Sequence, residues 1–391
     1  MNGEAKKYEV IVAGAGAMGS ATLYHLARRG IKALGLERFE IPHTMGSSHG
    51  VTRIIRLAYS EHPSYVPLLR RAYELWRDLE KRSGRSLLHI TGGIDAGPAG
   101  SAVLEGSLES CRIHNLPHEV LSSAELSARF PAYRLPAETM AVYQPDAGFL
   151  APEACIEAHV KLAEANGAEI HTGEPVVDWE VSGGRVTVRT PKADYEAEQL
   201  VIAAGAWVGK LVPSLAGLAR PERQVLAWFQ PQHPDLFAPA RFPVFNLEFD
   251  QGRYYGLPIF GVPGFKVGKY HHRREPIDPD DPRRDCGPED EELLQDFVRR
   301  CFPDGAGAAL SLLACIFTNT PDEHFILDRH PEFPEVLIAS PCSGHGFKFS
   351  SVIGEIMADL AERGETSHDI SLHRLARFGA RGRPQNEERT L

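Results

Sequence analysis

Three glycines near the start of the chain have the spacing of a turn that holds a dinucleotide. Gly14, Gly16 and Gly19 follow a short β-branched run and precede a helical pattern over residues 20–30, and Glu37 ends the next strand-like run. In such a unit the glycines allow a tight turn, close approach to a pyrophosphate and close packing of the helix on the strand. The helix N-terminus favours the charge of the phosphates. The pattern predicts a dinucleotide site, and the acidic Glu37 suits ribose hydroxyls and argues against the 2′-phosphate of NADP.

The glycine pattern alone does not separate FAD from NAD, and a glycine-rich turn without a ligand is the third interpretation. Two features favour FAD. The unit lies at the extreme N-terminus, and a later strand-like run over residues 199–205 ends in small residues that can pack against the cofactor.

The sequence patterns that surround this site alternate along the chain between two kinds of secondary structure. Strand and helix patterns occupy the beginning of the chain and residues 335–363, whereas residues 87–145 and 220–317 contain short strands broken by Pro and Gly. The alternation predicts a mixed α/β protein with two interleaved domains.

The composition excludes several other classes of protein. Hydrophobic residues make up 43% and charged residues 24% of the 391 residues, which is ordinary for a folded globular protein. The net charge of −10 argues against a nucleic-acid partner. No apolar run reaches membrane-spanning length and residues 1–8 are polar, so we expect no membrane segment, no signal peptide and a cytoplasmic location. The six cysteines have no paired spacing, so we expect neither a disulfide framework nor a metal site.

Four further segments stand out, at residues 43–56, 254–268, 314–318 and 343–351. Together, and in this order, they resemble the monomeric sarcosine oxidase family, which includes N-methyltryptophan oxidase and pipecolate oxidase. The resemblance implies a two-domain flavoprotein that oxidises secondary or methylated amino acids to imines, reduces O2 to H2O2 and carries FAD through a cysteine thioether. It also implies a monomer. The substrate stays open among sarcosine, N-methyl aromatic amino acids, pipecolate, proline-like rings and fructosyl amino acids.

The resemblance gives a function to each part of the interleaved chain. It implies a Rossmann-type FAD-binding domain assembled from residues 1–85, 150–215 and 320–391. It assigns residues 86–149 and 216–319 to a mixed-sheet substrate domain.

One cysteine matches the flavin-linking position of the family, and this is Cys315. A lone cysteine in an apolar run is ordinarily a packed core residue, so the linking role rests on the resemblance. Cys342 precedes the glycine-rich turn at residues 343–346, and we interpret it as structural.

Several charged and aromatic residues match the family's substrate side. Arg56 and Lys348 correspond to a carboxylate-binding pair, for which a bidentate guanidinium is well suited. Lys266 corresponds to a lysine that activates oxygen, and Arg53 to a residue beside the isoalloxazine ring. Without the resemblance, Arg56, Lys348 and Lys266 are more simply interpreted as surface charges.

Three aromatic residues complete the expected substrate side. Tyr255 matches a substrate-side tyrosine, and Phe245 is expected to form a pocket wall. A family histidine falls near residues 269–272, where this chain contains one extra residue. We assign it to His271, with His272 as the alternative.

The remaining expectation is the set of residues that contact the cofactor. It comprises Gly14, Gly16, Ala17, Met18, Glu37, Arg38, Gly46, Ser47, Ser48, His49, Thr52, Arg53, Val176, Gly205, Trp207, Cys315, Gly344, Gly346, Phe347 and Lys348.

Two functions compete with an oxidase that takes an amino-acid substrate and O2. A flavin-dependent amino-acid dehydrogenase would pass its electrons to another acceptor and would not need Lys266 near the flavin. A nucleotide-binding module without catalysis would purify colourless even with FAD in excess.

Overall fold

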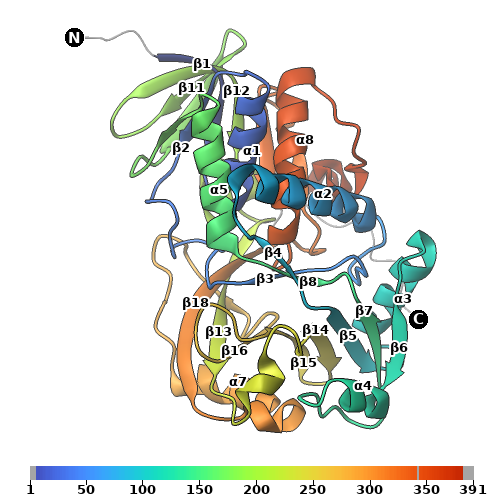
Figure 1. Ribbon diagram of the computed structural model, residues 1–391. Coiled ribbons are helices and arrows are strands. Elements are labelled where there is room, and N and C mark those ends of the chain that lie inside the picture. Colours follow the sequence, from blue (N-terminus) through green and yellow to red (C-terminus); the bar gives the residue numbers. More distant parts are fainter. Residues whose placement is uncertain (1–5, 341–342, 382–391) are drawn as a thin grey trace.

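The computed structural model describes residues 6–340 and 343–381, in which two large sheets are linked by a small one (Figure 1). The first sheet has eight strands. Its central strands β9, β2, β1, β12 and β20 run parallel, β19 is antiparallel to β20, and a β10–β11 hairpin extends the first half of β12. The strands are β1 (Lys6–Ala13), β2 (Ala33–Leu36), β9 (Glu169–His171), β10 (Asp178–Ser182), β11 (Arg185–Arg189), β12 (Asp194–Ile202), β19 (Ile326–Arg329) and β20 (Val336–Ser340).

Helices cover the first sheet. They are α1 (Ala17–Arg28), α2 (Tyr65–Ser83), α5 (Pro152–Ala165), α6 (Val208–Leu211) and α8 (Ser350–Arg363). Helix α1 packs between α5 and α8, and α2 crosses α8 (Figure 1). Gly354 makes the close contact of α8 with α1 possible, because a Cβ at this position would lie 2.5 Å from the backbone of Ala21.

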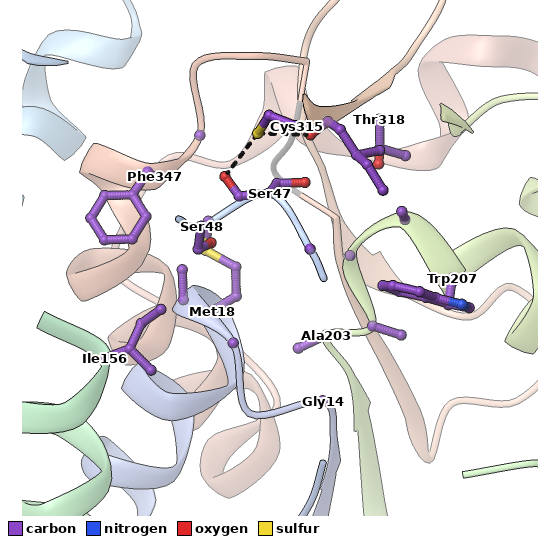
Figure 2. Close-up of a pocket in the computed structure, with 18 of the residues that line it drawn as sticks. Gly14, Met18, Ser47, Ser48, Ile156, Ala203, Trp207, Cys315, Thr318 and Phe347 are labelled. Atoms are coloured by element: carbon purple, nitrogen blue, oxygen red, sulfur yellow. Dashed lines mark hydrogen bonds between the residues drawn. The ribbon is translucent and has the colours of Figure 1, made fainter. Parts of the chain in front are cut away.

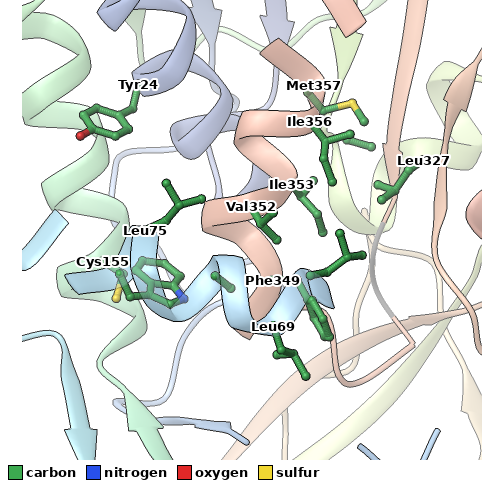
Figure 3. Close-up of a cluster of buried hydrophobic side chains, with 14 of the residues drawn as sticks. Tyr24, Leu69, Leu75, Cys155, Leu327, Phe349, Val352, Ile353, Ile356 and Met357 are labelled. Carbon is green, nitrogen blue, oxygen red and sulfur yellow. The ribbon is translucent and has the colours of Figure 1, made fainter. Parts of the chain in front are cut away.

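Helices α2 and α8 share a buried apolar core, to which Leu69 and Leu75 of α2 and Val352 and Ile353 of α8 belong (Figure 3). All four side chains are at most 8% exposed. Because burial of each such side chain contributes roughly 1.5–3 kcal/mol, this core holds α8 against α2.

The second sheet has nine strands in the order β17, β13, β16, β15, β14, β5, β7, β6, with β18 paired along β13. Strands β14 and β5 run parallel, and the other neighbours are antiparallel. The strands are β5 (Gly93–Pro98), β6 (Glu119–Ser122), β7 (Thr139–Gln144), β13 (Arg220–Phe229), β14 (Val244–Phe249), β15 (Gly252–Leu257), β16 (Phe265–Lys269), β17 (Glu275–Pro276) and β18 (Ala309–Asn319). Helices α3 (Ala102–His114), α4 (Ser123–Arg129) and α7 (Pro288–Cys301) accompany this sheet.

A three-stranded sheet of β3 (Arg53–Ile55), β8 (Gly148–Leu150) and β4 (Leu88–Ile90) lies between the two large sheets (Figure 1). The expected mixed α/β fold is confirmed. The strands of the first sheet come from three separate stretches of the chain and those of the second from two. The domain boundaries assigned from the sequence stay a prediction. Within the described residues, none of the helices has the length and apolar character to cross a membrane.

Candidate active site

A cavity of about 450 Å³ lies where the carboxyl ends of the parallel strands meet the second sheet. The β1–α1 turn, the end of β12 and the segment after Gly344 form one side, and β15 and β18 contribute the other. Figure 2 shows Gly14, Ala203 and Trp207 at one end of the cavity, with Cys315 and Phe347 farther along it. Open α/β sheets bind dinucleotides in this position.

The three glycines of the β1–α1 turn each meet a different constraint. Gly14 has a φ of +94°, and a Cβ there would lie 2.7 Å from the carbonyl oxygen of Ala203. A Cβ at Gly19 would lie 1.7 Å from the carbonyl oxygen of Gly14. Gly16 caps α1 and lines the cavity, and a Cβ there would meet open space. A side chain at Gly16 would therefore occupy room that a pyrophosphate needs.

The carboxylate of Glu37 is held at the end of β2. Its Oε2 accepts a hydrogen bond from the backbone N–H of Ala15 (2.7 Å), and Oε1 accepts one from Phe39 (3.0 Å). The side chain is buried and lines the cavity. Each oxygen keeps a second lone pair, and the binding of ribose hydroxyls by Glu37 stays a prediction.

Buried polar atoms without partners show that this lining fits a cofactor. The hydroxyls of Ser47 and Thr318 line the cavity, are buried and have no hydrogen-bond partner among the described residues. Buried polar groups in native proteins nearly always have partners. The lining is therefore complete only with a polar ligand, and FAD fits both these hydroxyls and the glycine-rich turn.

Cys315 lies on β18 with its side chain directed to the same cavity (Figure 2). Its Sγ lies 3.7 Å from Nη2 of Arg53 and 3.7 Å from the carbonyl oxygen of Ser47. Arg53 is fixed in turn by donating to the carbonyl oxygens of Ser47 (2.8 Å) and Thr52 (2.9 Å). The fold thus places a guanidinium beside a buried sulfur on the cofactor cavity. Cys342 lies outside the described residues.

Arg56 and Lys348 both line the cavity and are both buried. Nε and Nη2 of Arg56 bind Asp95 (3.2 Å) and Glu61 (2.9 Å), whereas Nη1 makes no hydrogen bond with any described residue. Lys348 donates to the carbonyl oxygen of His345 (2.7 Å), and its other two donors have no hydrogen-bond partner in the part of the chain that the structure describes. Burial lowers the pKa of Lys348 well below its ordinary value, and Arg56 adds to this. Burial opposes the charge of Arg56 too, but Asp95 and Glu61 raise its pKa.

Lys266 lies behind the cavity wall. Its Nζ donates to the carbonyl oxygens of Gly50 (2.8 Å) and Thr52 (2.7 Å) and to the hydroxyl of Thr52 (3.2 Å). Burial and the nearby Arg53 lower its pKa well below the ordinary value, while the three oxygens match the three donors of an ammonium group. His49 also lies behind the wall. Its two ring nitrogens have no partner among the described residues, and burial with Arg53 lowers its pKa to about 3.

The structure does not bring His271 or His272 to the cavity. His271 binds Glu222 (3.3 Å) and Glu323 (2.9 Å), and these hydrogen bonds raise its pKa to about 9. His272 is buried against Asp290 (2.9 Å). The preceding residue, Tyr270, lines the cavity instead.

Phe245 belongs to the core of the second sheet, where it packs on Phe302 and Phe242. The cavity is lined by its neighbour Asn246, because successive side chains of a strand point to opposite faces. Asn246 lies directly opposite Tyr255 in the β14–β15 ladder. The pairing of these two strands is therefore the signal that identifies Asn246.

The other residues expected from the sequence come together around the cavity. Those that line it are Gly14, Gly16, Ala17, Met18, Glu37, Arg38, Gly46, Ser47, Ser48, Thr52, Arg53, Arg56, Val176, Gly205, Trp207, Tyr255, Cys315, Gly344, Gly346, Phe347 and Lys348.

The loop that follows β17 contacts three residues that line the cavity. Asp280, which follows β17, accepts hydrogen bonds from Arg38 (2.6 Å) and from Nε1 of Trp207 (2.7 Å) and also binds Lys210. Arg38, Trp207 and Lys210 all line the cavity. This segment therefore holds the edge of the nucleotide side.

A parallel sheet with this turn and this cavity defines a dinucleotide-binding protein. The chain matches the family described as FAD dependent oxidoreductase over residues 9–360, and it belongs to that family.

Relatives with known names cover nearly the whole chain. It is 44% identical over 375 residues to a monomeric sarcosine oxidase of a Bacillus species, which covers 95% of this chain and 97% of the relative. It is 36% identical over 375 residues to an N-methyl-L-tryptophan oxidase of Citrobacter koseri, covering 95% of this chain and 99% of the relative.

Solved structures share the fold. NikD, an unusual amino acid oxidase, superimposes with a TM-score of 0.82 at 24% identity, covering 94% of this chain and 97% of its own. L-Proline dehydrogenase from P. horikoshii superimposes with a TM-score of 0.83 at 21% identity, covering 98% of this chain and 100% of its own.

Proposed function

We propose that this protein is an FAD-dependent oxidase of N-methylated or secondary amino acids of the sarcosine type. It converts the substrate to an imine, which water hydrolyses to an amine and an aldehyde or keto product, and it releases H2O2. The observation that carries the proposal is the placement of two buried cations, Arg56 and Lys348, on the same cavity as the glycine-rich turn and Cys315. The names of the relatives at 36–44% identity support the same activity.

The two cations suit a substrate carboxylate. Nη1 of Arg56 and two donors of Lys348 are free of protein partners among the described residues. Charge-assisted hydrogen bonds of this kind are shorter and stronger than neutral ones. A carboxylate bound there fixes one end of the amino acid and leaves its amine end to lie along the cavity.

Two tyrosines form an aromatic wall on the substrate side. The rings of Tyr255 and Tyr270 meet edge to face at 5.4 Å, and both line the cavity. They exclude water from the space beside the carboxylate site, which favours transfer of a hydride equivalent rather than side reactions.

FAD, when bound, supplies the redox chemistry by accepting a hydride equivalent from the substrate and passing two electrons to O2. Cys315 is the residue proposed to hold it covalently, with Arg53 beside the sulfur. Lys266 is proposed to place positive charge behind Thr52, where it stabilises charge that develops on oxygen.

The protein's colour and products test the proposal. The purified protein should be yellow, and acid precipitation should leave the colour in the pellet if the flavin is covalent. It should then release H2O2 with sarcosine, N-methyltryptophan or pipecolate. Turnover with an artificial acceptor but not with O2 would contradict the oxidase and support the dehydrogenase, which no observation favours at present. A monomeric state and a cytoplasmic location are further parts of the proposal, and the name of the relatives supports the first.

A further inference from the structure

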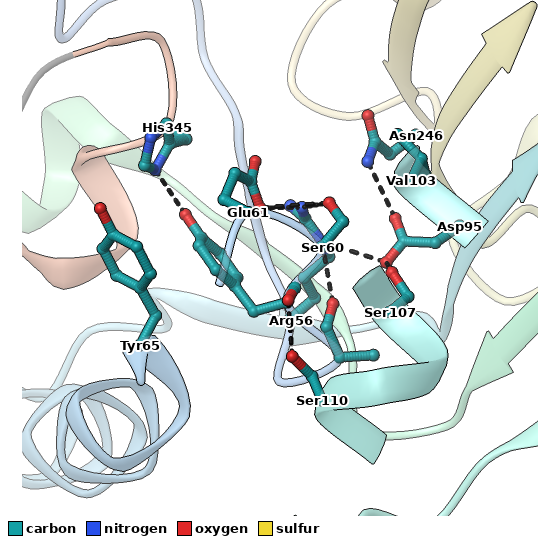
Figure 4. Close-up of polar contacts among 12 residues, drawn as sticks. Arg56, Ser60, Glu61, Tyr65, Asp95, Val103, Ser107, Ser110, Asn246 and His345 are labelled. Carbon is teal, nitrogen blue, oxygen red and sulfur yellow. Dashed lines mark hydrogen bonds and ion pairs between the residues drawn. The ribbon is translucent and has the colours of Figure 1, made fainter. Parts of the chain in front are cut away.

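Five buried or half-buried polar side chains form a closed ring of hydrogen bonds beside the cavity. Asp95 accepts from Nδ2 of Asn246 (3.1 Å) and from Nε of Arg56 (3.2 Å). Glu61 accepts from Nη2 of Arg56 (2.9 Å) and from Nη2 of Arg253 (2.7 Å). The amide oxygen of Asn246 accepts from Nε of Arg253 (2.6 Å), which closes the ring. Figure 4 shows part of it, with Asn246 and Arg56 on either side of Asp95.

The ring balances its own charges. Two guanidinium groups alternate with two carboxylates, and the side chains of Arg56, Asp95 and Glu61 are at most 9% exposed. Burial alone would raise the pKa of Glu61, but Arg56 and Arg253 hold it well below the ordinary value. The charged members of the ring are therefore paired with one another, and a buried charge needs such a partner.

Each side of Arg56 is held by a different carboxylate. Asp95 fixes Nε and Glu61 fixes Nη2, so the guanidinium plane cannot turn, and Nη1 is the nitrogen that stays free. Asn246 and Arg253 form no hydrogen bond with Arg56 themselves, but they bind the two carboxylates. An arginine that is ordered before the ligand arrives does not lose its rotamer freedom on binding.

The same ring touches the aromatic wall. The guanidinium carbon of Arg253 lies 4.3 Å from the centre of the Tyr270 ring. The guanidinium plane of Arg253 thus packs on the Tyr270 ring. The nitrogens of the same guanidinium bind Glu61 and Asn246.

We propose that Asn246 and Arg253 are positioning residues that hold Arg56 in the orientation in which it binds the substrate carboxylate. This inference rests on the proposed function, since it requires a carboxylate on Arg56. Arg253 also links the carboxylate site to the aromatic wall. One side chain therefore positions both Arg56, through Glu61 and Asn246, and the ring of Tyr270.

Two variants open the ring in different ways. Arg253→Lys keeps the positive charge, but a single ammonium cannot span Asn246 and Glu61 in the way that Nε and Nη2 do. Asn246→Leu removes the amide and leaves Arg253 in place. In the flavin-loaded enzyme, each should raise the KM for sarcosine about tenfold while kcat changes less than about twofold. The Kd of acetate, measured from the visible spectrum of the flavin, should rise by a similar factor.

A double-mutant cycle shows whether Arg253 acts through Arg56. In an Arg56→Ala background, Arg253→Lys should have little further effect on the Kd of acetate, because the residue that it positions is gone. Arg223→Lys is the matched control. Arg223 belongs to β13 of the same sheet and forms a buried pair with Asp290 of α7 (2.8 Å). It does not line the cavity, so Arg223→Lys should leave the KM unchanged.

The outcomes separate the two proposals. If Arg56→Ala leaves the Kd of acetate unchanged, the carboxylate site itself is wrong. If Arg56→Ala weakens acetate but Arg253→Lys and Asn246→Leu do not, the carboxylate site stands and the positioning role is overturned. Equal effects of Arg253→Lys with and without Arg56 would overturn it as well. So would failure of both ring variants to give flavin-loaded protein, because the ring would then serve the stability of the fold.

Discussion

The ring of Tyr59 lies against both cations of the carboxylate site, with the guanidinium carbon of Arg56 at 4.8 Å and Nζ of Lys348 at 5.3 Å from its centre. Its hydroxyl forms a 2.6 Å hydrogen bond with Nδ1 of His345. Nε2 of His345 faces the carbonyl oxygen of Glu323 at 2.9 Å and must donate to it, so Nδ1 is the acceptor from Tyr59. A buried aromatic face thus reduces the repulsion between two neighbouring positive charges.

Arg56→Ala should raise the KM for sarcosine by about 10- to 100-fold, since it removes charge-assisted hydrogen bonds to the carboxylate. The KM for an N-methylated amine without a carboxylate should change much less. Steady-state kinetics on the two substrates measure the difference. An equal effect on both would remove Arg56 from the carboxylate role.

Cys315→Ser should abolish covalent attachment, so acid precipitation should leave the flavin in the supernatant. Cys286→Ser is the matched control, because Cys286 also lies beside an arginine, Arg223, at 3.8 Å but does not line the cavity. Its pellet should stay yellow. Flavin that remains in the Cys315→Ser pellet would exclude the proposed thioether.

Lys266→Met should slow the reaction of the reduced enzyme with O2 about 10²-fold, because it removes a fixed cation near the developing charge. Anaerobic reduction by the substrate should change little. Stopped-flow absorbance of the flavin resolves the two half-reactions. Lys269→Met serves as the control and should leave both rates unchanged, because Lys269 lies three residues farther along β16 and does not line the cavity.

Gly19→Ala should abolish flavin binding or folding, because the new Cβ would lie 1.7 Å from the carbonyl oxygen of Gly14. Backbone atoms cannot move aside as a flexible side chain would. The ratio of flavin to protein after purification reports the effect. Gly217→Ala, where a Cβ meets no atom within 4 Å, should bind flavin normally.

The stability of the protein should fall as pH rises through the pKa of His271. Hydrogen bonds to Glu222 and Glu323 raise this pKa from 6.5 to about 9. A raised folded-state pKa gives stability that is fully present below about 6.5 and is lost as pH approaches and passes 9. With allowance for solvent screening, we expect about 1 kcal/mol.

His271→Gln should remove this contribution. Urea unfolding at pH 6.5 and at pH 9.5 gives the free energy of unfolding of wild type and variant. The difference between the two proteins should be about 1 kcal/mol at pH 6.5 and should disappear at pH 9.5. A difference that is the same at both pH values would show that the two glutamates do not favour the charged histidine.

The nucleotide side of the cavity was predictable because local sequence determines it. Gly14, Gly16 and Glu37 lie within one strand–helix–strand unit, whose geometry follows from the backbone. The resemblance added Cys315 and Arg53, which the structure brings within 3.7 Å of each other although 262 residues separate them.

The substrate side depends on strand pairing, which the sequence alone leaves open. Phe245 and Asn246 have opposite orientations, and a shift of one residue decides which of them meets the cavity. A shift of one residue also decides that Tyr270, and not His271, lines the cavity. The closed ring could not be predicted without knowing that Asp95 of β5 lies opposite Asn246 of β14. These strands are about 150 residues apart in the sequence, so local patterns do not reveal their pairing.

The order of segments around the first sheet has a consequence for the synthesis of the protein. Residues 6–36 form the first half of the nucleotide side, but β20 and the segment from Gly344 to Lys348 come from near the other end of the chain. The cavity therefore has all its walls only after the ribosome has passed residue 348. Until β20 has been made, the nascent chain carries a parallel sheet in which the edge of β12 that β20 pairs with is unfilled.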